Sequence, residues 1–189
     1  MESGSKKSYF PEEIISKIGY GVVLLIVLSL ALACGNDDKD KSPTTPGPGT
    51  RNGTLTATLS GDINLNFNSN TAYGLQSQAD AASGEPGLMQ VQGVVNVGGV
   101  QYSIDIQIYR NPATGTFQLR FPPQDGVGSV LKNSDGYFSE SGSVTFTQVS
   151  KTSMAGTFNF KAFKMGGVGQ KVTVDVSNGS FNVPVIYED

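Results

Sequence analysis

The sequence predicts an all-β, antiparallel domain that follows a short apolar segment and a polar linker. Beyond Gly53, apolar residues recur at every second position, and five such runs begin with a glycine followed by Ser or Thr. No helical spacing of apolar residues is visible beyond Cys34. Because successive side chains of a strand point to opposite faces, a period of two indicates strands with one buried and one wet face. We expect nine or ten strands and favour a two-sheet β-sandwich over the closed barrel that the same pattern allows.

Composition narrows the possible classes of function. The 189 residues suit one domain and a non-globular segment, and the formal net charge is −3 at pH 7. Lysines and arginines are scattered, so we expect no nucleic-acid partner. The chain has no histidine and one cysteine, which excludes Ser/His/Asp and Cys/His catalysis, histidine metal sites and an internal disulfide. We predict no catalytic residue, no metal and no cofactor.

The first element is an apolar segment at residues 22–33, VVLLIVLSLALA, preceded by Lys6, Lys7 and Lys17. Twelve helical residues span about 18 Å, well short of a hydrocarbon core of about 30 Å. Charge, then a short apolar run, then small residues is the order typical of a secretory signal. We assign residues 1–33 to a signal peptide, with an uncleaved membrane anchor as the alternative.

The lone cysteine follows this segment, in Leu30-Ala31-Leu32-Ala33-Cys34. This string resembles a bacterial lipobox, in which the cysteine is diacylated and becomes the mature amino terminus. The resemblance implies a lipid on Cys34 that holds the protein to a membrane. With Gly35 next, it also implies an outer-membrane lipoprotein of the cell envelope, facing the periplasm or exposed on the surface.

The second element is a linker that extends from Cys34 to Asn52. Residues 35–52, GNDDKDKSPTTPGPGTRN, contain no large apolar side chain and combine charge with proline and glycine. Such a stretch buries too little surface to offset the entropy of ordering it. We therefore predict a flexible linker over 34–52 and a single all-β domain over 53–189.

The strands of this domain are predicted from their inward-facing sets. These sets are Leu55, Ala57, Leu59; Ile63, Leu65, Phe67; Val91, Val95, Val97; Val100, Tyr102, Ile104, Ile106, Ile108; Phe117, Leu119, Phe121; Val144, Phe146; Phe158, Phe160, Ala162; Val172, Val174, Val176; and Phe181, Val183, Val185. The outward sets are mostly Asn, Gln, Thr, Ser and Asp. We expect outer faces that are polar and weakly charged.

Turn residues predict which strands are neighbours. Gly98-Gly99 and Asn178-Gly179 each separate two alternating runs and predict β-hairpins. Residues 111–115 join the strands at 100–109 and 115–121 through a longer loop, and sequential strands are expected to be antiparallel. Pro184 cannot donate to a ladder, so it predicts that the last strand lies at an edge or carries a bulge.

Three segments break the alternation, at 69–87, 122–141 and 164–171, and are predicted to be loops. Four aromatic residues lie in or beside irregular segments: Tyr73, Tyr109, Tyr137 and Phe138. An exposed ring can stack on a sugar or a peptide, so these four are the candidate ligand-binding residues.

Two acidic patterns are weaker candidates. Residues 132–137, KNSDGY, with Glu140, place oxygen ligands near a glycine but lack the carboxylates of a full calcium loop, so we interpret them as a solvated turn. Asp105 and Asp175 alternate outward on strands and could be neighbours, as a hydrolase would need. We interpret them as ordinary surface acids.

The carboxy-terminal third carries a second resemblance. GSVTFTQVSKTSMAGTFNFKAF, at 142–163, and KVTVDVSNGSFNVPV, at 171–185, resemble the closing segment of a group of bacterial lipoproteins of the DUF6252 type, found in Bacteroidetes and related bacteria. The resemblance covers roughly 50 residues and implies no functional residue, because none is defined for that group.

Together these features lead us to expect a lipid-anchored, non-catalytic binding or interaction module with an envelope protein or a glycan as partner. One alternative is a structural accessory subunit of a membrane complex, which needs a continuous apolar surface patch. The other is a carboxylate-dependent hydrolase, which needs two acids in one cleft.

Overall fold

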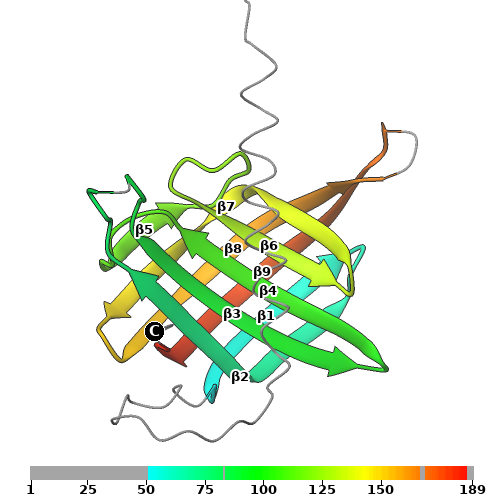
Figure 1. Cartoon of the computed structure of the whole chain (residues 1–189). Helices are drawn as coiled ribbons and strands as arrows, with labels where there is room; N and C mark the ends of the chain where they lie inside the picture. Colours follow the sequence, from blue (N-terminus) through cyan, green and yellow to red (C-terminus); the bar gives the residue numbers. More distant parts are fainter. Residues whose placement is uncertain (1–50, 83, 167–168, 187–189) are drawn as a thin grey trace, which may run out of the picture. The chain divides into compact units, whose positions relative to one another are not determined.

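A computed structural model describes residues 51–82, 84–166 and 169–186, which belong to one compact unit, Thr45–Asp189. The predictions for residues 1–50, including the signal peptide and the lipid on Cys34, lie outside the described residues. Nine strands follow one another (Figure 1): β1 (Gly53–Gly61), β2 (Leu65–Ser77), β3 (Leu88–Val97), β4 (Val100–Ile108), β5 (Gly115–Gln118), β6 (Gly126–Lys132), β7 (Asp135–Val149), β8 (Ser153–Met165) and β9 (Lys171–Pro184).

The strands form one closed barrel. The order β7-β6-β4-β3-β2-β1-β9-β8 returns to β7, because β7 pairs with β8 as well as with β6, and every pairing is antiparallel. The short strand β5 pairs with the second half of β7, beyond the residues that pair with β6. The all-β, antiparallel prediction is confirmed. Of the two architectures that the sequence allowed, the structure is the barrel and not the favoured sandwich.

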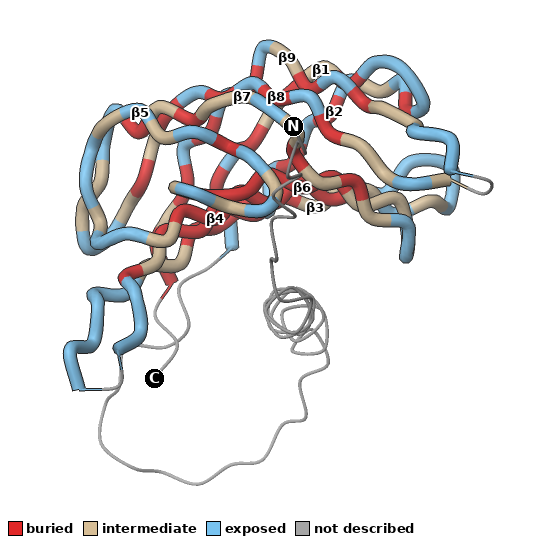
Figure 2. Tube along the Cα trace, turned by 90° about the horizontal axis from the view of Figure 1, so that it is seen from above, coloured by how far each residue is buried: buried red, intermediate tan, exposed pale blue. Residues whose placement is uncertain are grey.

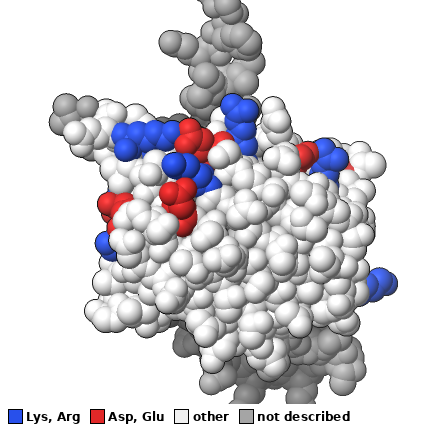
Figure 3. Space-filling model, turned by 180° about the vertical axis from the view of Figure 1, so that it is seen from behind, with Lys and Arg blue, Asp and Glu red and all other residues white. Residues whose placement is uncertain are grey.

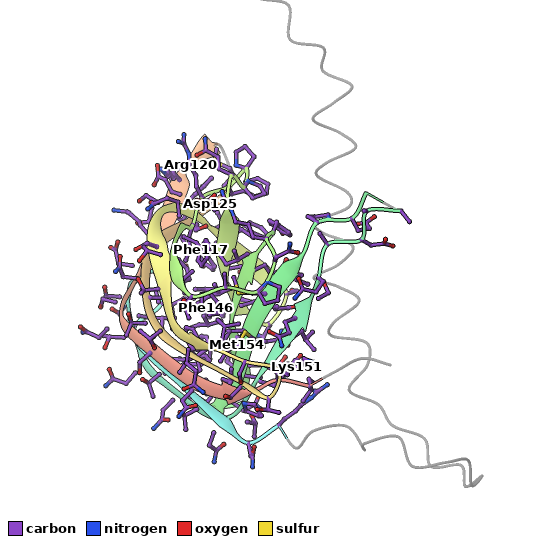
Figure 4. The ribbon with its side chains drawn as sticks, turned by 90° about the vertical axis from the view of Figure 1, so that its left-hand side faces the viewer. Phe117, Arg120, Asp125, Phe146, Lys151 and Met154 are labelled. Atoms are coloured by element: carbon purple, nitrogen blue, oxygen red, sulfur yellow. The ribbon has the colours of Figure 1, made fainter. Side chains whose placement is uncertain are left out.

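Apolar side chains from all eight ring strands fill the barrel interior. Figure 2 marks the buried residues along the backbone. The largest fully buried side chains are Tyr137, Phe67, Phe146, Leu55, Met89, Ile104, Ile106, Ile108, Leu119, Met154, Val91 and Val130. At one end, the ring of Phe117 meets the ring of Phe146 edge-on, with centroids 6.1 Å apart (Figure 4). The core cluster draws buried apolar side chains from all eight ring strands, as the core of a single domain does.

The repeated glycines serve close packing inside strands as well as turns. Gly156 and Gly179 lie within β8 and β9, although Gly179 was predicted to be part of a turn. A Cβ atom at Gly156 would lie 2.7 Å from Cζ of Phe181, and one at Gly179 would lie 2.6 Å from Cδ2 of Phe158. These glycines leave room for the phenylalanine rings of the core.

One of the two predicted hairpins is confirmed and the other is wrong. Gly98 and Gly99, with φ of 60° and 80°, form the β3–β4 turn. Asn178, with φ of 53°, instead lies inside β9, where the register with both β1 and β8 shifts. Asn-Gly supplies a left-handed residue, and that residue suits a β-bulge as well as a two-residue turn.

The predicted loops hide strands that the alternation failed to reveal. Strand β6 and the first half of β7 occupy much of 122–141, and β2 continues to Ser77. The inward positions of β6 include Gly126 and Gly128, and a Cβ atom at Gly128 would lie 3.0 Å from the Phe160 ring. A large residue of β8 thus fills the space beside β6, and β6 shows no inward apolar run.

One prediction about strand neighbours is corrected, and another is met in its second alternative. Strand β9 is not at an edge, because it pairs with β1 and β8, but it carries a bulge at Asn178, and Pro184 is its last residue. The strands on either side of the 111–115 loop do not pair, because β5 pairs with β7 and β4 pairs with β6.

Candidate functional site

The four candidate aromatic residues lie in three different environments. Tyr73 on β2 and Tyr109 just beyond β4 lie on the outer side of the same wall, which β2, β3, β4 and β6 form. Phe138 is half-buried, and its ring lies 5.3 Å from that of Phe121. Tyr137 is fully buried in the core, where its hydroxyl donates a hydrogen bond to the Asp62 carboxylate. Its placement in an exposed loop is therefore wrong, because the residue belongs to strand β7.

Polar side chains surround the two outward tyrosines. Because Ile104, Ile106 and Ile108 point into the core, the alternate residues of β4 point outward. We call this group the tyrosine–glutamine cluster, which consists of Tyr73, Gln90, Gln92, Asp105, Gln107 and Tyr109. All of its members are buried except Tyr109, which is half-buried.

A chain of hydrogen bonds orders the tyrosine–glutamine cluster. Tyr109 donates to Oε1 of Gln107 over 3.0 Å, and Nε2 of Gln107 donates to Oδ2 of Asp105 over 2.9 Å. Nε2 of Gln90 reaches Oδ1 and Oδ2 of Asp105 at 3.0 and 3.1 Å. A phenol that donates at one end and a carboxylate that accepts at the other determine the orientation of the amide between them.

The electrostatics of the cluster follow from its burial. Burial raises the pKa of the Asp105 carboxyl to about 6. Hydrogen bonds from Gln107, Gln90 and the Ile106 amide lower this pKa, but their effect is smaller than that of burial. Burial, and then the charge of Asp105, raise the pKa of Tyr109 to about 12, so this phenol remains a donor at neutral pH.

The cluster uses its polar groups internally. Both carboxylate oxygens of Asp105 accept bonds from amides, and the Tyr73 hydroxyl donates to Oε1 of Gln92. The guanidinium group of Arg51 lies 4.5 Å from the centre of the Tyr73 ring. The arrangement therefore ties β2, β3 and β4 together, and we assign it a structural role in this wall.

The acidic candidates do not form a site. Asp105 on β4 and Asp175 on β9 belong to opposite sides of the ring, with three strands between them in either direction, so they are not neighbours. In the 132–137 turn, Oδ2 of Asp135 lies 2.8 Å from Nζ of Lys164, and Glu140 pairs with Lys171. Within the described ranges, no group of three Asp, Glu, Cys or His residues is arranged to hold a metal ion.

A small open cavity of about 180 Å³ lies beside the end of β2, lined by Gln76, Ser77, Gln78, Pro112 and Lys151. Nε2 of Gln76 donates to the Ser150 carbonyl over 3.0 Å, while its buried Oε1 has no partner among the described residues. Ligand pockets commonly measure about 300 Å³ or more. This cavity is therefore below the usual size for an organic ligand.

The opposite wall of the barrel has a different surface. Three rows of outward side chains cross its strands, and we call them together the hydroxyl–amide wall. In the order of the strands across the wall, β5, β7, β8, β9, β1 and β2, the rows are Gln118, Ser143, Asn159, Ser177, Thr58, Asn66; then Thr116, Thr145, Thr157, Ser180, Thr56, Asn68; and then, from β7 to β1, Gln148, Ala155, Asn182, Thr54.

The central row is in direct register across all six strands. Thr116 pairs with Thr145, Thr145 with Thr157, Thr157 with Ser180, Ser180 with Thr56, and Thr56 with Asn68. Two of these pairs join hydroxyl to hydroxyl: Thr116 Oγ1 to Thr145 Oγ1 over 2.8 Å, and Thr56 Oγ1 to Ser180 Oγ over 2.9 Å.

The hydroxyl–amide wall is exposed and uncharged. Its members are six threonines, four asparagines, three serines, two glutamines and one alanine, each exposed or half-buried. Figure 3 shows this side of the barrel, where the charged residues gather toward one edge and leave a broad uncharged area. Charge begins with the next row, where Lys161 and Asp175 lie 3.8 Å apart.

Sequence reasoning predicted the weak charge of this surface but not its rows. The outward positions of each run are visible as Thr, Ser and Asn, whereas their alignment depends on how distant strands pair. The bulge at Asn178, which was predicted to be a turn, shifts the register of β9 by one residue. Without that shift, Ser177 and Ser180 would not both face outward.

The chain was compared with protein families, curated proteins and solved structures. No protein-family model, no curated protein and no solved structure matches it. Residues 51–82, 84–166 and 169–186 include no helix with the length and apolar character to cross a bilayer.

Proposed function

We propose that this protein is a lipid-anchored component of a bacterial cell envelope and that its barrel is a non-catalytic binding module. In this proposal, Cys34 carries the lipid and the linker that follows it separates the membrane from the barrel, which begins at Gly53. The proposal places the protein at the outer membrane, as the lipobox-like string and Gly35 imply.

The observation that carries the binding role is the filled interior. Side chains of all eight ring strands occupy it, and Tyr137, Phe67 and Phe146 are the largest of them. A filled barrel has to meet its partners on the outside. The hydroxyl–amide wall offers such a surface, because its central strands β8, β9 and β1 are each paired on both sides and its polar groups face water.

The anchor and the linker fit such a role. Each buried methylene of a lipid chain contributes about 0.8 kcal/mol, so two or more chains give stable attachment where one is marginal. The 18 residues from Gly35 to Asn52 reach about 50 Å when extended at about 3 Å per residue. A barrel on such a linker can reach binding partners within about 50 Å of the membrane surface.

Binding of the isolated barrel to cell envelopes tests the proposal. We expect fluorescently labelled Thr45–Asp189 to bind isolated bacterial envelopes saturably and to be displaced by an excess of the unlabelled barrel. Binding that rises linearly with concentration, or that unlabelled barrel fails to displace, would contradict a binding role. The heat-unfolded barrel is the control for non-specific adhesion.

A further inference from the structure

We infer that the hydroxyl–amide wall binds a neutral polysaccharide that lies across the strands along the central row. This inference rests on the proposed function, because it names the ligand class for the surface through which the barrel would act. Four observations support it: charge, hydrogen-bonding capacity, spacing and rigidity.

The charge of the wall selects against charged ligands. Surfaces designed for solubility carry about 25–35% Lys, Arg, Glu and Asp, whereas none of the sixteen members of the wall is charged. In the row next to the wall, Lys161 and Asp175 lie 3.8 Å apart and offset each other's charge. The wall therefore offers no net attraction to phosphate, sulfate or uronate groups.

The hydrogen-bonding groups of the wall match those of a sugar. Hydroxyl and amide side chains both donate and accept, as sugar hydroxyls do. In the described part of the chain, the side chains of Thr157, Asn159 and Asn182 make no hydrogen bond, and all three are exposed. Their donors and acceptors now face water and can exchange it for a ligand.

The spacing of the central row suits a polymer. Neighbouring strands lie about 4.8 Å apart, so six strands place the row over about 24 Å. The spacing between neighbouring strands is comparable to the length of one sugar unit in an extended glycan. Successive sugars can therefore meet successive strands, with Thr145, Thr157, Ser180 and Thr56 at the centre.

The wall is rigid before a ligand arrives. Threonine has a branched Cβ and few rotamers, and β8, β9 and β1 are each paired on both sides. Short side chains on such strands lose little entropy on binding, which allows weak individual hydrogen bonds to add up.

The test is retention of the barrel, Thr45–Asp189, on insoluble neutral polysaccharides. We use microcrystalline cellulose, mannan and amylose as neutral probes, with alginate and polygalacturonate as anionic ones. The test variant is Thr157→Val with Ser180→Ala, which removes two hydroxyls of the central row and keeps the branched Cβ at 157. The matched control, Thr114→Val with Ser134→Ala, makes the same changes at two exposed positions that are not members of the wall.

We expect the wild-type barrel to bind at least one neutral probe and neither anionic one. The Thr157/Ser180 variant should bind that probe at least tenfold more weakly, and the Thr114/Ser134 control should match the wild type. If urea unfolding shows that the double variant does not fold, Thr157→Lys serves in its place, since a charge in the row should cause the same loss.

Several results would overturn the inference. These are no retention on any neutral probe, preference for an anionic one, or retention that neither wall variant weakens. A change of oligomeric state in the variants, measured by analytical ultracentrifugation, would also overturn it by making the wall a contact between copies. In each case, saturable binding of the barrel to envelopes would leave the proposed function standing.

Discussion

At the scale of single residues, contacts between glycine and phenylalanine shape the barrel. Gly156 faces the Phe181 ring, Gly179 faces Phe158, and Gly128 faces Phe160. In the first two pairs one strand gives up its side chain so that a ring from the neighbouring strand can enter the core, and in the third the ring comes from β8, with β7 between it and β6. Glycine weakens a strand because it packs nothing, and here the ring of the neighbour supplies that packing.

Substitution of one such glycine should therefore cost stability. A Cβ atom at Gly156 would lie 2.2 Å from the Thr145 carbonyl oxygen, and backbone cannot move aside as a flexible side chain can. We expect Gly156→Ala to lower the free energy of unfolding by about 1–3 kcal/mol, the usual cost of overpacking a core. Urea unfolding of the barrel measures the change.

The matched control for this experiment is Gly136→Ala. There the new Cβ atom would meet the Phe138 ring at 3.5 Å, an ordinary contact distance. Gly136→Ala should change the free energy of unfolding by no more than about 0.5 kcal/mol. Equal effects of the two substitutions would show that the close approach of the Thr145 carbonyl and the Phe181 ring does not restrict position 156.

Residue-scale prediction from the sequence succeeded where the period of two applied. Ile104, Ile106 and Ile108 all face the core, as their alternation predicts. It failed at Tyr137, which lies in a segment without visible alternation and proves to be fully buried. A tyrosine can be buried when its hydroxyl finds a partner, and only the fold brings Asp62 to it.

At the scale of the elements, the bulge in β9 determines which side chains form the wall. Asn178 adopts a φ of 53°, in the left-handed region where side chains with a branched Cβ are strained. The register of β9 with both β1 and β8 shifts beside it. Residues on either side of the bulge thereby keep their apolar side chains inward and their hydroxyls outward.

Substitutions at Asn178 test this role. Asn178→Val should lower the free energy of unfolding by about 1–2 kcal/mol, the cost of placing a residue other than Gly, Asn or Asp in the left-handed region. Asn178→Gly should be neutral within about 0.5 kcal/mol, because glycine adopts this conformation without strain. Urea unfolding of both variants gives the comparison, and a valine variant as stable as the glycine variant would contradict the assigned backbone strain.

Elements with their own alternating runs, such as β1, β4 and β8, could be predicted from the sequence. Strand β6 could not, since Gly126 and Gly128 take two of its inward positions and Val127 is buried on its outer side. The residue types of β6 depend on side chains from distant parts of the sequence, such as Phe160, which occupies the space beside Gly128. Local periodicity cannot report such neighbours.

At the scale of the whole molecule, the proposed anchor and the barrel should behave as separable parts. We expect mass spectrometry of the native protein to find an acylated Cys34 as the amino terminus. Cys34→Ser should move the protein from the membrane fraction to the aqueous fraction without changing the urea midpoint of the barrel, because the barrel has a core cluster built from its own eight ring strands. Ser42→Ala, in the linker, is the matched control and should remain in the membrane fraction.

Two outcomes would count against this anchor. Recovery of an intact Met1 would show that the amino-terminal segment is retained. Membrane attachment that persists in Cys34→Ser would point to the apolar segment at 22–33, and not to a lipid, as the anchor. Neither outcome would alter the barrel or its wall.

By itself, the sequence determined the strand content, the antiparallel arrangement and the weakly charged exterior, because a period of two and the polarity of side chains are local properties. Closure into a barrel was decided by tertiary structure. Strand β7 is long enough to pair with β6 along its first residues and with β8 along most of its length, and no local pattern encodes that reach. The rows of the hydroxyl–amide wall were decided in the same way, since pairing between residues as distant as Thr56 and Ser180 brings them into line.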